Sequence, residues 1–476
     1  MADPQLDALV KAGLQSLLVY PSDAEYTERQ RSYWAANAAL GPKAIVLPRT
    51  AEDVSRIVKA LAEVDGKAAI RSGGHMQWAG ANDIHDGITI DLGRMTNVTY
   101  DSQKKLASIQ PGARWGHVYD ALEPHGVCVA GGRDANVGVG GFLTGGGNSY
   151  YSGRVGMGCD SVANFEVVLA NGDIVNANAT ENPDLWKALK GGSGNFGIVT
   201  RFDLKTIPAT PLWGGMRASP RSAGDAIVQS VVDFTNDNEK NPETAYIINF
   251  TYNPSVVPDV VIASVMVDTL GKEDAPIFEN IKKVPTLFQD VKSRTISDIA
   301  KAYVLPSGLR QTWFTLSFKN DGDVVKKAGE LHDQLVEELK ALLPAQNFVT
   351  QCLFQPLPTF FAKRSVEQGG NVLGLDSVPD NALLWLLTGT VNTEEHEKIM
   401  EEKLSAFAKS LEEYAKSKGS DIPWLYGNYT DKTQCPFSSY GAANIDFLRK
   451  VSAKYDPAGM FQNKFVGGFK IPKNQA

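Results

Sequence analysis

Hydrophobic and polar residues alternate along the chain with two different periods. Between residues 40 and 208, short apolar runs predict strands over 44–47, 68–71, 87–92 and 107–110, and a hairpin of 165–169 with 174–177. The hairpin turns at Asn171-Gly172, a favoured turn pair. Helical spacing follows Thr50 and Asp53, which are close to a capping box, and recurs over 115–122 and 184–189. This part of the chain therefore predicts one unit of short strands and short helices.

A different pattern begins near residue 212, where glycine thins out and long amphipathic helices appear. Two such helices are predicted over 323–343 and 393–418, and Gly419 stands where a C-terminal cap belongs. Strand-like runs occupy 245–252, 260–267, 312–318, 348–354 and 383–391. This order predicts an antiparallel sheet covered on one face by helices.

Length and composition narrow the class of protein. A chain of 476 residues is too long for one compact core. The pattern divides it into an N-terminal segment (1–39), a first domain (40–208), a second domain (209–423) and a segment that returns to the first domain (424–476). The net charge of −7 is spread out, which argues against a nucleic-acid or anionic-membrane partner. No apolar run reaches the roughly 18 residues of a membrane span.

Cysteines and the first residues bear on the compartment. The four cysteines lie far apart and predict neither a disulfide framework nor a zinc site. The first ten residues lack the basic and apolar regions of a signal peptide. A cytoplasmic location is therefore expected, with secretion as the alternative if a leader has been removed.

Glycine is concentrated in loops that suggest a ligand. Bare backbone N–H groups in such loops can hold phosphates. A dinucleotide fingerprint starts at Gly138-Val139-Gly140, but Leu143 stands where its third glycine belongs, and no P-loop sequence occurs. Glycine density by itself fits a cofactor cradle and a turn-rich structural region equally well.

Four ordered motifs resolve this choice by resemblance. They are Arg71-Ser72-Gly73-Gly74-His75, the glycines of 138–147, the run 191–199, and Tyr426-Gly427-Asn428-Tyr429 followed by Tyr455-Asp456-Pro457. Together they resemble the PCMH-type FAD-binding domain of the vanillyl-alcohol-oxidase superfamily, in the fungal branch of its berberine-bridge-enzyme-like group. The resemblance covers about 40–208 and 424–470. It implies an α+β fold with a two-subdomain FAD-binding domain, not a Rossmann domain, and a substrate domain whose antiparallel sheet is covered by helices.

The resemblance also implies which residues hold the cofactor. His75 matches a histidine that bonds covalently to the flavin, for which an unprotonated imidazole is needed. Asp134 stands where many members have a cysteine for a second link, so FAD linked through His75 only is expected. Phe142 replaces a histidine that bonds the flavin in many members. The other cofactor-binding residues implied are Arg71, Ser72, Gly73, Gly74, Val137, Gly138, Gly140, Gly141, Gly145, Gly146, Asn195, Gly197, Ile198, Val199, Tyr426 and Asn428.

Candidate catalytic residues follow from the same resemblance. Val137 matches a position that gates oxygen, where valine is typical of members that use O2; an ordinary packed valine is the alternative. Tyr426 matches a tyrosine that serves as the base in several members, with Tyr429, Tyr150 and Tyr151 as rivals; a role in packing or in covering the flavin is the alternative for Tyr426. A free tyrosine has a pKa near 10, so such a base needs a nearby cation or a hydrogen bond to its phenolate. The sequence does not identify that group.

The substrate side is predicted from strand alternation. Gln351, Leu353 and Gln355 share one face of their strand, which either binds substrate or faces solvent.

The expected function is oxidation of a C–H bond next to O or N, or of an activated ring carbon. The expected substrate is a small secondary metabolite; hydride passes to FAD, and O2 reoxidises the flavin to give H2O2. A flavin dehydrogenase that does not use O2 and a flavin-binding, non-redox cyclase remain as alternatives. A monomer or a weak homo-oligomer is expected.

Overall fold

The computed structural model describes residues 3–473. The first unit of the protein begins with a four-stranded sheet. The strand order is β1 (Leu18–Val19), β2 (Ala44–Val46), β4 (Ile88–Asp91) and β3 (Ala68–Arg71); β2, β4 and β3 are parallel and β1 is antiparallel. Helix α3 (Ala51–Ala62) begins at the predicted cap, where the Thr50 Oγ1 accepts a hydrogen bond from the Asp53 N–H at 3.1 Å. The N-terminal segment, with α1 (Pro4–Lys11) and α2 (Ala24–Arg31), belongs to this unit because it supplies β1.

A second sheet of five antiparallel strands completes the first unit. Its order is β5 (Val98–Asp101), β6 (Leu106–Ile109), β10 (Ile198–Lys205), β8 (Val162–Val168) and β9 (Ile174–Asn178). The predicted hairpin is confirmed as β8–β9, and Gly172 takes the left-handed conformation that its turn requires (φ 79°). Two short helices, α4 (Trp115–Leu122) and α7 (Pro183–Leu189), pack against this sheet, and two more, α5 (Val139–Thr144) and α6 (Ser152–Val155), lie in the segment between β7 (Val127–Cys128) and β8.

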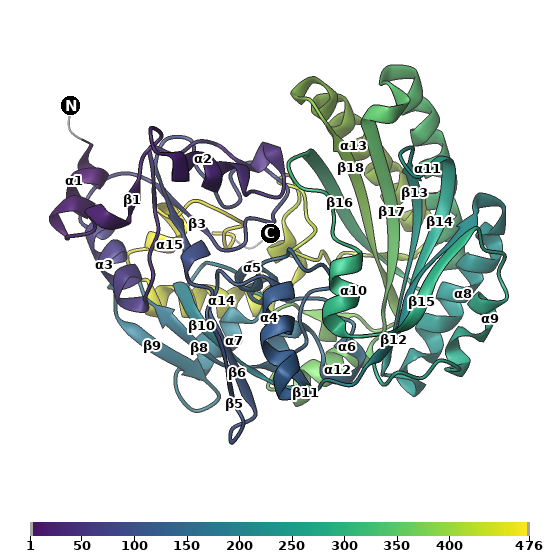
Figure 1. Ribbon diagram of the computed structural model, residues 1–476, viewed down its shortest axis with the longest axis horizontal. Coiled ribbons are helices and arrows are strands. Elements are labelled where there is room, and N and C mark those ends of the chain that lie inside the picture. The colour runs from purple at the N-terminus through teal and green to yellow at the C-terminus, as the bar shows by residue number, and fades with distance from the viewer. Residues whose placement is uncertain (1–2, 474–476) are drawn as a thin grey trace.

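The second unit is one antiparallel sheet of eight strands. Its order is β15 (Phe288–Arg294), β12 (Leu212–Pro220), β14 (Val257–Asp268), β13 (Thr244–Asn253), β17 (Phe348–Leu357), β18 (Ala382–Val391), β16 (Arg310–Lys319) and β19 (Asp421–Ile422). Helices α8 (Gly224–Asp237), α9 (Glu279–Lys282), α11 (Gly322–Leu342) and α13 (Glu394–Lys418) cover its outer face (Figure 1). The predicted α+β class, with one sheet face covered by helices, is confirmed.

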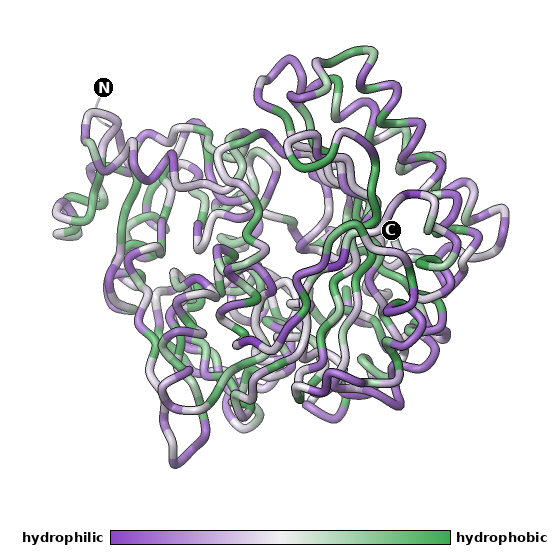
Figure 2. The backbone as a smooth tube through the Cα atoms, turned by 45° about the vertical axis from the view of Figure 1, so that its right-hand side comes forward, coloured by the Kyte–Doolittle hydropathy of each residue, from purple (hydrophilic) through white to green (hydrophobic). Residues whose placement is uncertain are grey.

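Strand alternation gives this large sheet two different faces. Alternate side chains, such as Phe250, Phe354 and Trp385, are buried against the helices. The residues between them turn to the other side, toward the first unit. Figure 2 shows the apolar strands inside and the mixed colouring of the outer helices that this arrangement requires.

The end of the chain lies beside the first unit. After α14 (Ala442–Tyr455) and α15 (Met460–Asn463), Val466 donates its N–H to the carbonyl of Ala68 in β3 at 3.0 Å. Figure 1 shows these yellow elements among the purple and blue ones. Within residues 3–473, no helix is both long enough and apolar enough to cross a membrane.

Candidate functional site

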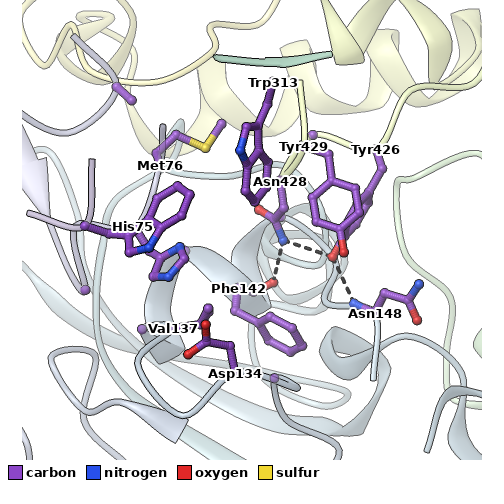
Figure 3. A pocket seen from close by; sticks show the side chains of 18 of the residues that line it. His75, Met76, Asp134, Val137, Phe142, Asn148, Trp313, Tyr426, Asn428 and Tyr429 are labelled. Carbon is purple, nitrogen blue, oxygen red and sulfur yellow. Dashed lines mark hydrogen bonds between the residues drawn. The ribbon is translucent and has the colours of Figure 1, made fainter. Parts of the chain in front are cut away.

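A cavity of about 900 Å³ lies between the first unit and the inner face of the eight-stranded sheet. The glycine loops, the N-terminal segment, the sheet and the C-terminal segment all contribute to its wall. Figure 3 shows His75 on one side of this cavity and Tyr426 and Tyr429 on the other, with Phe142 between them. Across residues 3–473, no group of three or more His, Cys, Asp or Glu residues is arranged to hold a metal ion.

His75 lines the cavity in the loop that follows β3. Its ring stacks on Trp34, with the centroids 4.4 Å apart and the planes 7° from parallel. Its Nε2 is buried and has no hydrogen-bond partner among the described residues. Burial, together with the positive charge of Arg114, lowers the pKa of His75 to about 3. The imidazole is therefore neutral near pH 7.

The first two glycine loops meet backbone to backbone. A Cβ on Gly73 would lie 2.5 Å from the Cα of Gly138, so no side chain fits between them. The Ser72 Oγ accepts a hydrogen bond from the Gly140 N–H at 3.2 Å, which joins the same two loops. At Gly141 and Gly194, by contrast, a Cβ would meet no atom within 4 Å, and both residues line the cavity. Bare backbone thus faces open space from two different loops.

Most of the predicted cofactor-binding residues line this cavity. They are Ser72, Gly73, Gly74, His75, Val137, Gly138, Gly140, Gly141, Gly145, Gly197, Ile198, Val199, Tyr426 and Asn428.

Arg71, Gly146 and Asn195, which the sequence also predicted to bind the cofactor, lie behind the residues that line the cavity. Arg71 is buried behind the loop, where it pairs with Asp91 at 3.3 Å and lies over the Tyr33 ring at 3.7 Å. The Asn195 amide donates to the carbonyls of Gly192 and Phe469, and a Cβ on Gly146 would meet Leu373 at 3.0 Å. All three residues hold the loops in shape from behind.

Three hydrogen-bond donors hold the hydroxyl group of Tyr426 in place. Its hydroxyl oxygen accepts hydrogen bonds from the N–H groups of Gly147 (3.0 Å) and Asn148 (2.9 Å) and from the Asn428 amide (3.1 Å). The side chain is 1% exposed, and burial raises the pKa of Tyr426 above its usual value. Tyr426 therefore stays protonated and fixes the loop that carries Gly147 and Asn148.

Tyr429 has the cationic neighbour that the sequence did not identify. The Arg133 guanidinium donates from Nη2 to the Tyr429 hydroxyl at 2.8 Å and to the Gln355 Oε1 at 2.6 Å. The Asn148 amide donates to the same Gln355 oxygen at 3.3 Å, which fixes its orientation. Tyr429, Arg133 and Gln355 all line the cavity. The Arg133 guanidinium and the Tyr429 hydroxyl are thus in direct contact on the cavity wall.

Tyr151 was a candidate base, and the structure places it outside the cavity wall. It is buried, and the Cys128 thiol donates to its hydroxyl at 3.4 Å. Burial raises the pKa of Tyr151 well above its usual value. Tyr151 thus lies in the core behind the wall, whereas Tyr429 lies on the wall.

Asp134 and the cysteines bear on the number of flavin links. Asp134 lines the cavity, and its carboxylate accepts the backbone N–H groups of Asn136 (2.7 Å) and Leu305 (2.9 Å). Burial raises the pKa of Asp134. All four cysteines are free, three of them are buried, and none lines the cavity.

The substrate side of the cavity contains the predicted strand face. Gln351, Leu353 and Gln355 on β17 line the cavity, and none of them faces solvent at a sheet edge, because β17 pairs with β13 and β18.

Several residues of this wall escaped sequence reasoning. Trp34 comes from the N-terminal segment, which the sequence set apart from the cofactor domain, and Trp313 comes from β16. Arg133 carried a signal, since it is a charged residue inside a glycine-rich loop. Lys470 lines the cavity from the C-terminal segment, where burial lowers its pKa to about 8, and no described residue bonds its amine.

Comparison with known sequences gives relatives over nearly the whole chain. A family model described as an FAD binding domain matches residues 42–178. The FAD-dependent monooxygenase drtC of Aspergillus calidoustus is 37% identical over 457 residues, covering 95% of this chain and 87% of that protein. The FAD-dependent monooxygenase sdcF of Emericella nidulans is 35% identical over 469 residues, covering 98% of both chains.

Comparison with solved structures gives the same architecture. The berberine-bridge-enzyme-like protein 1 of Physcomitrella patens aligns over all of both chains with a TM-score of 0.80 and 19% identity. At that identity the likeness concerns the fold, and it agrees with the PCMH-type arrangement that the motifs predicted.

Proposed function

Because this chain belongs to the family of FAD-dependent oxidoreductases that contain this FAD binding domain, we propose that it oxidises a C–H bond next to O or N in a small molecule. The same chemistry extends to an activated ring carbon, and a secondary metabolite is the proposed substrate. The observation that carries the proposal is the Arg133–Tyr429 pair on the cavity wall across from His75. FAD, when bound, accepts the hydride and returns the electrons to O2, which leaves as H2O2.

The residues present fit FAD. Gly141 and Gly194 offer bare backbone beside open space, as close approach of a phosphate or a ring requires. The His75 Nε2 and the Trp34 Nε1 are buried polar atoms without partners among the described residues, which a bound ligand would satisfy. Lys470 supplies a positive charge, suited to a diphosphate. His75 is the proposed covalent anchor, and no cysteine of the chain lies on the wall for a second link.

Each protein group then has a task. Tyr429 takes the substrate proton, and Arg133 stabilises the charge that forms on its oxygen. Gln355 orients the Arg133 guanidinium by accepting its hydrogen bond, and the Asn148 amide holds the same Gln355 oxygen in place. Gln351 and Leu353 lie beside them on β17 and position the substrate.

Anaerobic reduction tests this function. Purified yellow protein is mixed with candidate alcohols, amines and hydroxylated ring compounds in the absence of oxygen, and the flavin absorbance is followed. A substrate should bleach the flavin, and admission of air should restore the colour with one H2O2 formed per substrate oxidised. Product formed without any bleaching would instead favour a non-redox cyclisation.

Both relatives described above are named FAD-dependent monooxygenases, which favours a second candidate function, monooxygenation. In that reaction one atom of O2 enters the product and the other leaves as water, with two electrons supplied by a reductant. Turnover under ¹⁸O2 separates the two functions. An oxidase gives labelled H2O2 and unlabelled product, whereas a monooxygenase gives product heavier by one labelled oxygen.

Val137 provides a test of oxygen access. It is half-buried on the cavity wall, at the position that the resemblance links to oxygen gating. Val137→Leu adds one methylene, which should narrow the path to the ring and slow reoxidation of reduced flavin by O2. Anaerobic reduction by substrate should be nearly unchanged. Stopped-flow mixing with oxygen measures the first rate, and unaltered reoxidation would leave Val137 as an ordinary packing residue.

A further inference from the structure

The charge of the cavity is opposite in sign to that of the protein. The chain carries a net charge of −7, yet the cavity is lined by two cations, Arg133 and Lys470, and by one carboxylate, Asp134. That carboxylate already accepts two backbone N–H groups. Within residues 3–473, the wall therefore offers no free carboxylate to a substrate ammonium group, which makes an amine a poor fit.

The two cations lie in different parts of the wall. Lys470 follows Phe469, whose carbonyl is bonded by Asn195 of the loop 191–197. This end carries the bare backbone of Gly194 and suits the cofactor. Arg133 lies at the other end, beside Gln355 of β17 and Tyr429. The charge of Arg133 is thus left for the substrate side.

Arg133 has N–H donors that no described residue accepts. Its Nη2 serves Gln355 and Tyr429, but across the described chain no acceptor bonds its Nε or Nη1. A guanidinium carries five N–H donors in a planar fork that matches an oxyanion well. No described carboxylate forms an ion pair with it, so its charge is uncompensated inside the cavity.

Flat aromatic rings surround the same space. Trp313 packs edge-on against Tyr429 (5.7 Å between centroids) and against Trp34 (5.3 Å), and the Arg133 guanidinium lies 6.0 Å from the centre of the Tyr150 ring. The Trp313 Nε1 is buried and has no acceptor among the described residues. The wall thus presents flat apolar surfaces with unused donors and an unused cation.

From these observations we propose that the substrate is a planar aromatic compound with an acidic oxygen, a phenol or a carboxylic acid, bound as its anion against Arg133. Trp313 donates to a second oxygen of the same molecule. That the bound compound is a substrate rests on the proposed function. Its binding beside Arg133 is tested separately, without turnover.

Binding of matched probes to the yellow holoprotein tests the proposal. Titration with 2-naphthoate and with its neutral isostere 2-naphthamide is followed by the change in flavin absorbance and by calorimetry. The anion should bind roughly 10- to 100-fold more tightly, the range of a charge-assisted hydrogen bond. A second pair, 4-nitrophenolate and 4-nitroanisole, separates phenols from carboxylic acids.

Variants locate the effect. Arg133→Gln should remove the preference for the anion and leave the affinity for the amide nearly unchanged, and Arg133→Lys should keep part of it. Arg154→Gln is the matched control, because it removes a guanidinium that lies over the Tyr151 ring and off the cavity wall, and it should leave the preference intact.

Three results would overturn the proposal: equal affinities for anion and amide in wild type, a preference that survives in Arg133→Gln, or one that vanishes in Arg154→Gln. The comparison of anion and amide in the wild-type protein needs no variant, so the proposal can be tested even if a variant misfolds. Anion binding in a protein whose flavin no compound reduces would count against the proposed function alone.

Discussion

Replacing Tyr429 with phenylalanine should slow the reduction of the flavin by substrate about 10²- to 10⁴-fold, the usual contribution of a positioned acid or base. The hydroxyl receives a hydrogen bond from Arg133 at 2.8 Å, so the charge that forms on its oxygen is stabilised. Phenylalanine keeps the edge-on contacts with Trp313 and Tyr426 and removes only the hydroxyl. Anaerobic stopped-flow absorbance measures the rate.

Substrate binding should change far less than the rate. The lost interaction matters mainly in the transition state, so the dissociation constant from the same stopped-flow series should stay within a few-fold of wild type.

Tyr426→Phe is the matched control, since the same atom is removed from the neighbouring ring. Three donors lose their acceptor there, and two of them are buried backbone N–H groups of Gly147 and Asn148. Stability should therefore fall by about 1–3 kcal/mol or more, while the chemical step is affected less. Denaturant unfolding of both variants separates the roles. A slow Tyr426→Phe beside a Tyr429→Phe of normal rate would return the base to Tyr426.

Replacing His75 with alanine should abolish covalent flavin altogether. Acid-precipitated wild-type protein should stay yellow, and one peptide, the one that contains His75, should carry the added mass of the flavin. The alanine variant should release all of its flavin on precipitation. Cys128→Ser is the control and should keep the yellow colour, because Cys128 lies off the cavity wall. Flavin mass on a cysteine peptide would contradict the single link.

The pH dependence of attachment gives a separate check on His75. A free histidine with a pKa near 6.5 loses its nucleophilic form as pH falls through that value. Burial lowers the pKa of His75 to about 3, so the neutral form persists on both sides of pH 6.5. Covalent attachment of FAD to the apoprotein should then show no decline in rate between about pH 7.5 and pH 5.5. A loss of rate centred near pH 6.5 would mean that the ring is solvated when it reacts.

Local sequence determined much of this protein. Alternation and capping predicted β3, α4, α13 and the central strands β13, β17, β18 and β16, because each element's apolar face repeats at its own period. Strand β12, the edge strands β15 and β19 and the helix α8 were missed; β19 is only two residues long. The glycine motifs predicted an FAD site only through their resemblance to a known family. The structure shows one reason for the glycines, because a Cβ on Gly73 would lie 2.5 Å from the Cα of Gly138.

Only the tertiary structure decided how the site works. Gln355 lies 222 residues after Arg133 in the sequence, and Tyr429 lies 296 residues after it. No local pattern predicts that these three residues share one hydrogen-bond network. Tyr150 and Tyr151 are neighbours in the chain, yet only Tyr150 lines the cavity, because consecutive side chains point in different directions. Asp134 and Arg133 both line the cavity, but the Asp134 carboxylate already accepts two backbone N–H groups, whereas the Arg133 guanidinium bonds only Gln355 and Tyr429 among the described residues. Packing between distant segments decides which charged residues line the cavity and which of them remain unpaired. The chemistry of the site therefore depends on the tertiary structure.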